Sequence, residues 1–122
     1  MAGTVKKLAV IGSTGSIGRQ TLEVVRALKG RFQVVALAAG QNAALLKEQI
    51  GEFKPEYVYC AAKFNPPRGI KALPIEEIVS LHDIDIVVMA ISGAAGLGAV
   101  LAAVKAGKTI ALANKESLVS AG

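Results

Sequence analysis

The fold of this chain is decided by residues 8–18, which read LAVIGSTGSIG. The four leading apolar residues predict a short strand that is buried on both faces. Gly12, Gly15 and Gly18 follow in the pattern G-x-x-G-x-x-G. Glycines between a strand and a helix allow a sharp reversal, tight helix packing and close approach of a pyrophosphate to free N–H groups at the helix start. The stretch therefore predicts a dinucleotide-binding turn; the alternative is a turn that packs a helix on a strand and binds nothing.

Strands and helices are predicted to alternate along the rest of the chain. Apolar runs predict strands at 8–11, 34–39, 57–60, 85–91 and 109–113, and helical periodicity predicts helices at 17–28, 43–53, 74–81 and 94–106. Residues 61–73 are expected to form a loop. Such alternation indicates parallel strands joined by right-handed crossovers. We therefore predict an α/β fold of the Rossmann type, a doubly wound parallel sheet of five or more strands in the order 3-2-1-4-5, as one domain over residues 1–122.

The first two predicted helices each have one apolar face. Ser16 is expected to cap the first helix and Gly30 to end it. The residues expected to face the core are Ile17, Thr21, Val24, Val25 and Leu28 in the first helix, and Leu45, Leu46, Gln49, Ile50 and Phe53 in the second.

Composition and charge exclude several classes of function. The formal net charge is +5, but the basic residues are scattered rather than clustered with aromatics, so no nucleic acid partner is expected. Residues 86–104 lack charge, yet their glycines and alanines divide them into a strand and a helix, so no membrane segment is expected. The single cysteine, Cys60, allows no internal disulfide, and no secretory signal or transit peptide is seen. These features favour a cytoplasmic location.

The residues after the second predicted strand bear on the choice of cofactor. An NAD site usually places Asp or Glu about 20 residues beyond the glycine turn to hold the ribose hydroxyls. Residues 38–42 read AAGQN, without a carboxylate. A 2′-phosphate would meet no repelling charge there, and Gln41 and Asn42 can donate hydrogen bonds to it. The pattern favours NADP over NAD; the alternative is that Gly40, Gln41 and Asn42 form an ordinary polar loop.

Two more turns follow strands at the sheet edge where ligands bind in such folds. Residues 92–96 read SGAAG, which suits either the approach of a nicotinamide ring or the packing of a helix on the sheet. Residues 114–117 read NKES. A lysine in that place can neutralise an anionic substrate or polarise an oxygen. A helix start, with Asn114 as its cap, explains the same four residues equally well.

Four segments together resemble the 1-deoxy-D-xylulose 5-phosphate reductoisomerase family, NADPH-dependent enzymes of non-mevalonate isoprenoid biosynthesis. The segments are residues 12–18, 39–42, 92–97 and 113–119, and the last, ANKESLV, is the most specific. The resemblance extends over nearly the whole chain. It implies that residues 1–122 form an NADPH-binding domain.

The resemblance also implies roles for individual residues. Those expected to contact the cofactor phosphates are Thr14, Gly15, Ser16 and Ile17. Those expected to surround the adenosine ribose and its 2′-phosphate are Gly40, Gln41 and Asn42. Asn114 and Glu116 would contact NADPH near its reactive end, and Lys115 would contact the substrate. Because Gln41 stands where lysine or arginine is frequent in the family, weaker binding of the 2′-phosphate is implied.

Family members are longer than this chain, and the resemblance places several functions outside it. A metal-binding catalytic domain and a C-terminal helical domain would supply the catalytic residues and the ligands of Mg²⁺ or Mn²⁺, so none is assigned to this chain. The full-length enzyme would be a homodimer that converts 1-deoxy-D-xylulose 5-phosphate to 2-C-methyl-D-erythritol 4-phosphate, and the fragment alone is expected to be inactive. The alternatives are a stand-alone dinucleotide-binding module and the cofactor domain of another NADP-dependent reductase.

Overall fold

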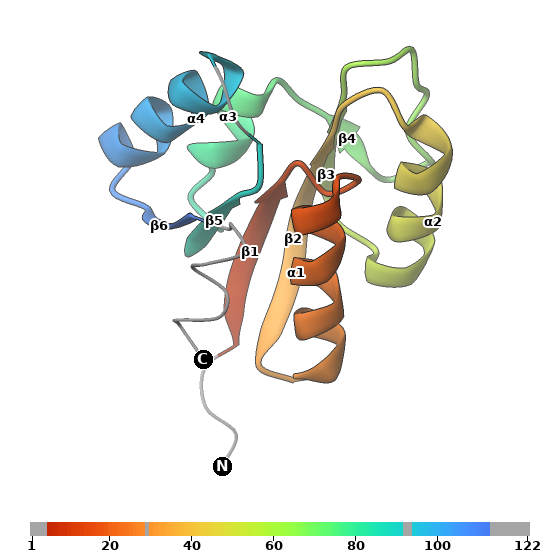
Figure 1. Cartoon of the computed structure of the whole chain (residues 1–122), viewed down its shortest axis with the longest axis horizontal. Helices are drawn as coiled ribbons and strands as arrows, with labels where there is room; N and C mark the ends of the chain where they lie inside the picture. Colours follow the sequence, from red (N-terminus) through yellow and green to blue (C-terminus); the bar gives the residue numbers. More distant parts are fainter. Residues whose placement is uncertain (1–4, 29, 92–93, 113–122) are drawn as a thin grey trace.

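The computed structural model describes residues 5–28, 30–91 and 94–112, which form a parallel β-sheet with helices on both faces (Figure 1). The elements are β1 (Lys6–Ile11), α1 (Ser16–Ala27), β2 (Phe32–Ala39), α2 (Ala43–Phe53), β3 (Tyr57–Cys60), β4 (Lys71–Ala72), α3 (Ile75–Val79), β5 (Ile86–Met89), α4 (Ala94–Lys105) and β6 (Thr109–Leu112). The six strands pair in the order β4-β3-β2-β1-β5-β6, and every pairing is parallel. The predicted order of the five expected strands is therefore confirmed.

The sheet is buried on both faces because its strands are apolar at consecutive positions. In β1, Leu8 and Val10 belong to one buried cluster with residues of α1 and α2. Ala9 and Ile11 belong to the opposite cluster with residues of α3 and α4. Figure 1 shows α1 and α2 covering one face and α3 and α4 the other. The doubly wound arrangement follows from this division.

Helix α1 contacts the sheet through a stripe that only partly matches the prediction: Thr21 and Val25 are buried as expected, and Ile17 packs against the same core. Its buried residues are Gly18, Thr21, Leu22 and Val25. Val24 and Leu28, which were expected in the core, are 47% and 40% exposed. The error has a physical cause: Gly18 packs directly on the turn and sets the rotation of the helix, yet a glycine adds nothing to a hydrophobic pattern.

The beginning of α1 also differs from the prediction that Ser16 caps it. Gly15 is the N-cap residue, with φ −79° and ψ 174°, and the helix start has no capping hydrogen bond from a side chain. The helix begins at Ser16 itself. By contrast, α2 follows the prediction closely, because Leu46, Gln49 and Ile50 are buried on its sheet-facing side.

The segment expected to be a loop between residues 61 and 73 contains a short strand. Lys71 and Ala72 form β4, which pairs with Tyr57 and Val58 of β3. Both residues of β4 are exposed, so no alternating hydrophobic pattern marks the strand in the sequence. The strand expected at 85–91 is shorter than predicted, Ile86–Met89, because its partner β1 ends where Ile11 pairs with Met89.

Residues 86–104, the uncharged stretch, divide between β5 and α4 as expected. In the described ranges, no helix has both the length and the apolar character needed to cross a bilayer.

Gly51 offers a test of how freely α2 accepts a side chain. This glycine is exposed, lies inside the helix, and has nothing within 4 Å of the position a Cβ would occupy. Gly51→Ala should therefore raise the free energy of unfolding by about 0.5–1 kcal/mol, because alanine loses less conformational entropy in a helix. Urea denaturation checks this value. A destabilised variant would contradict the open geometry around Gly51.

Candidate dinucleotide site

The three glycines of the turn after β1 have different structural roles. Gly12 has φ +97°, and a Cβ there would lie 2.6 Å from Ile91 Cγ2. A Cβ on Gly18 would lie 1.9 Å from the carbonyl oxygen of Gly12. At Gly15, the nearest atom to a Cβ would be that same oxygen at 3.8 Å, an ordinary contact. Packing and backbone conformation therefore require glycine at positions 12 and 18, whereas position 15 is open to solvent.

The turn lies at the point where the strand order reverses. β1 has β2 on one side and β5 on the other, and the chain crosses from β4 at one edge to β5 beyond β1. The N–H groups of Gly12 and Ser13 donate to Ala38 O of β2 at 2.8 and 2.9 Å, and Ala90 N–H donates to Ile11 O at 2.8 Å. These bonds hold the ends of three adjacent strands together. Ligands of doubly wound sheets bind in the crevice at this switch point.

Several N–H groups of the turn have no partner within the described part of the chain. Helical hydrogen bonding begins with Arg19 N–H, which donates to Gly15 O at 2.9 Å. The N–H groups of Thr14, Ser16 and Ile17 make no hydrogen bond to any described residue. Unpaired N–H groups at a helix N-terminus, together with the helix dipole, favour an anion. The turn therefore has N–H groups available to an anion beside the open side of Gly15.

Gln49 connects the turn to α2 through a buried hydrogen bond. Its Nε2 donates to Ser13 O at 2.7 Å, and the residue is 5% exposed. Ser13 itself is fully buried. The sequence placed Gln49 on the core-facing stripe but did not reveal this contact. The available signal was a polar amide among apolar neighbours, since such a group needs a hydrogen-bond partner when it is buried.

The loop after β2 adjoins the turn at the same edge of the sheet. Gly40, Gln41 and Asn42 are all exposed. Asn42 is the N-cap of α2, where its Oδ1 accepts a hydrogen bond from Leu45 N–H at 3.0 Å. The carbonyl of Gly40 accepts from Cys60 Sγ at 3.3 Å and from Ala61 N–H at 3.0 Å. The backbone of the loop is thus held in place, and its side chains remain available to solvent.

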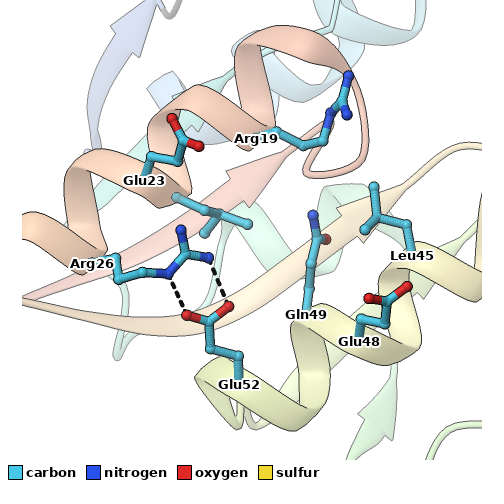
Figure 2. Close-up of a pocket in the computed structure, with 8 residues that line it drawn as sticks. Arg19, Glu23, Arg26, Leu45, Glu48, Gln49 and Glu52 are labelled. Carbon is cyan, nitrogen blue, oxygen red and sulfur yellow. Dashed lines mark hydrogen bonds and ion pairs between the residues drawn. The ribbon is translucent and has the colours of Figure 1, made fainter.

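A groove of about 300 Å³ runs between α1 and α2 (Figure 2). The residues that line it are Arg19, Leu22, Glu23, Arg26, Leu45, Glu48, Gln49 and Glu52. Arg26 and Glu52 form a bidentate ion pair across the groove, with Arg26 Nη2 at 2.7 Å from Glu52 Oε1. The hydrogen bond that Arg26 donates to the Glu52 carboxylate raises the pKa of the Arg26 guanidinium above its ordinary value. Because both side chains are nearly half exposed, this pair contributes little to stability.

Some predicted site residues lie outside the described residues. These are Asn114, Lys115 and Glu116, as well as Ser92 and Gly93 of the small-residue turn. In residues 5–28, 30–91 and 94–112, no three His, Cys, Asp or Glu side chains gather in a way that could hold a metal ion.

A doubly wound parallel sheet with a glycine-rich turn and unpaired N–H groups at its switch point defines a Rossmann-type domain, the class that binds dinucleotides. A profile of the 1-deoxy-D-xylulose 5-phosphate reductoisomerase family matches residues 8–122. This chain belongs to that family.

Curated relatives and solved structures agree with this assignment. The chain is 50% identical to 1-deoxy-D-xylulose 5-phosphate reductoisomerase of Geotalea uraniireducens, over 96% of this chain and 33% of the relative. It is 44% identical to that of Pelotomaculum thermopropionicum, over 96% of this chain and 34% of the relative. A crystal structure of DOX-P reductoisomerase in complex with NADPH, fosmidomycin and magnesium has a TM-score of 0.78 and 34% identity, over 94% of this chain and 31% of that one. The chain thus spans about a third of the length of its relatives.

The reductoisomerase from Zymomonas mobilis in complex with NADPH is also similar in structure. Its TM-score is 0.74 and its sequence is 32% identical, over 98% of this chain and 34% of that one.

Proposed function

We propose that this chain is the NADPH-binding domain of a 1-deoxy-D-xylulose 5-phosphate reductoisomerase. The whole enzyme converts 1-deoxy-D-xylulose 5-phosphate to 2-C-methyl-D-erythritol 4-phosphate, and NADPH supplies the hydride when it is bound. The observation that supports the proposal best is the set of unpaired N–H groups of Thr14, Ser16 and Ile17 beside the open side of Gly15. These groups suit the negative charge and the width of a pyrophosphate.

The loop Gly40–Gln41–Asn42 is proposed to hold the adenosine ribose and its 2′-phosphate. No acidic side chain stands in this loop, so a phosphate would meet no direct repulsion there. Asn42 uses its Oδ1 to cap α2, and its Nδ2 makes no hydrogen bond to any described residue. Asn42 can therefore cap the helix with its oxygen and donate to a phosphate with its nitrogen. Gln41 is exposed and can donate from the same loop.

The reactive end of the cofactor and the substrate are proposed to be contacted by residues 114–116. Asn114 and Glu116 would contact NADPH, and Lys115 would contact the substrate. The whole enzyme is proposed to be a homodimer. Its ligands of Mg²⁺ or Mn²⁺ and its catalytic residues are proposed to belong to polypeptide outside these 122 residues. On this proposal the chain alone binds the cofactor and does not turn over substrate.

Calorimetric titration of the chain with NADPH and with NADH tests the proposal. NADPH should bind, and more tightly than NADH by at least about tenfold, because hydrogen bonds to a charged phosphate are stronger than those to a hydroxyl. Failure to bind millimolar NADPH would contradict the proposed site. Oxidation of NADPH by the chain alone, with 1-deoxy-D-xylulose 5-phosphate and Mg²⁺ present, would contradict the placement of catalysis outside it.

A further inference from the structure

The buried amide of Gln49 makes a single hydrogen bond within the described part of the chain, and it is to the glycine turn. Gln49 Nε2 donates to Ser13 O at 2.7 Å, while Gln49 Oε1 is buried without a partner among the described residues. The orientation of the amide is determined by this contact, because Oε1 facing the carbonyl oxygen of Ser13 would be repulsive. Figure 2 shows the side chain directed from α2 into the space between α2 and α1.

The Ser13 carbonyl is part of the same peptide plane as the Thr14 N–H. A trans peptide is planar, so its C=O and N–H point in opposite directions. The described chain contains no cis peptide bond. When Gln49 holds the Ser13 carbonyl on the α2 side of the turn, the Thr14 N–H is directed to the other side. That N–H is one of those without a partner in the described part of the chain.

Rotation of this peptide would reverse the electrostatics of the turn. The carbonyl oxygen of Ser13 would then take the direction that the Thr14 N–H has now, and the Thr14 N–H would face α2. A carbonyl dipole pointing at a pyrophosphate is repulsive, whereas an N–H dipole is attractive. The orientation of a single peptide therefore decides whether the turn binds or repels phosphate at Thr14.

We propose that Gln49 is a positioning residue for the cofactor: its hydrogen bond to Ser13 O orients the Ser13–Thr14 peptide so that the Thr14 N–H faces the pyrophosphate. This inference rests on the proposed NADPH-binding function and goes beyond it by assigning a role to a residue of α2 outside the glycine turn. The pyrophosphate is common to NADPH and NADH. Loss of the Gln49 side chain should therefore lower the affinity for NADPH and for NADH equally and leave the preference between them unchanged.

Three variants distinguish the positioning of the Ser13–Thr14 peptide by Gln49 from a contribution of its side chain to core packing alone. Gln49→Met keeps the length of the side chain and removes the donor. Gln49→Glu keeps the shape and replaces the donor by a carboxylate, which donates only when it is protonated. Ile50→Val is the matched control, because Ile50 is 4% exposed on the same helix and its apolar side chain belongs to the buried core cluster.

Affinity for NADPH and NADH and the urea denaturation midpoint are measured for each variant. Gln49→Met should lose about tenfold in affinity for both cofactors, the amount expected for one hydrogen bond. Ile50→Val should lose stability and keep its affinity for both cofactors. For Gln49→Glu, the affinity for NADP⁺ is compared with that of the unaltered chain at the same pH. The variant's affinity should approach that of the unaltered chain as the pH falls, because the carboxyl is then protonated and can donate.

The Thr14 amide provides a readout that does not depend on the cofactor. In the free chain, the ¹⁵N-resolved Thr14 signal should broaden or shift in Gln49→Met and stay in place in Ile50→Val. If the unaltered chain binds NADPH and Gln49→Met binds it equally well, the positioning role is wrong and the proposed function stands. If the unaltered chain binds neither cofactor, the proposed function is wrong and the positioning role falls with it.

Discussion

Gly18→Ala is expected to destabilise the domain by about 3 kcal/mol or more, because the new methyl group has no room. Its Cβ would lie 1.9 Å from Gly12 O, 2.8 Å from the carbonyl carbon of Gly12 and 2.8 Å from Ser13 Cα. All three atoms belong to the backbone, so no flexible side chain can move aside. Relief requires α1 to move away from β1, which would open the packing of Leu22 and Val25 on the sheet.

Urea denaturation followed by circular dichroism measures the loss. The matched control is Gly51→Ala, which adds the same methyl group inside a helix at an open position. A decrease of less than about 1 kcal/mol for Gly18→Ala would show that the helix adjusts at little cost, contrary to the close backbone contacts at Gly18. Because the turn itself would be displaced, the variant should also lose affinity for NADPH.

Gly15→Asp is expected to abolish most NADPH binding while leaving the stability of the fold nearly unchanged. Gly15 is the N-cap of α1 with an extended backbone, and aspartate is a favoured N-cap residue in that conformation. A Cβ at this position meets nothing closer than 3.8 Å, so the free energy of unfolding should change by only a few tenths of a kcal/mol. A pyrophosphate at the same place would face a carboxylate, and Coulomb repulsion of about 3 kcal/mol corresponds to at least a hundredfold loss of affinity.

Gly15→Asn is the control for this variant. Asparagine caps helices about as well as aspartate and has the same shape without the charge. The difference in NADPH affinity between the two variants, measured by calorimetry at equal salt concentration, therefore isolates the repulsion. Increasing the ionic strength should reduce that difference. Equal affinities for Gly15→Asp and Gly15→Asn would mean that no phosphate lies near Gly15.

Most of the sheet could be predicted because its strands are marked by apolar runs between glycines. The runs at residues 8–11 and 34–39 have no polar residue, which is typical of strands covered on both faces. Strand β4 could not be predicted, because it has two exposed residues and exists through its pairing with β3. The hydrophobic pattern of a sequence therefore indicates which strands are buried, but it does not reveal an exposed edge strand that is held by backbone hydrogen bonds.

Part of the candidate site was also evident from local sequence. The glycine turn, the loop Gly40–Gln41–Asn42 and the lack of an acidic residue among residues 38–42 are all local features of the sequence. The connection between Gln49 and Ser13 joins residues that are 36 positions apart. No spacing rule links them, because their contact depends on how α1 and α2 are rotated on the sheet.

The sequence by itself determined that a glycine-rich turn joins a buried strand to a helix, since backbone freedom, apolar runs and helix periodicity are local properties. The tertiary structure alone decided what each glycine does. Gly12 and Gly18 are required because other backbone and side-chain atoms approach them, and Gly15 is left open because nothing does. The same close approach at Gly18 set the rotation of α1, so that Thr21 and Val25 face the sheet as predicted but Val24 and Leu28 do not, since steric contact between distant segments outweighs the hydrophobic pattern of one helix.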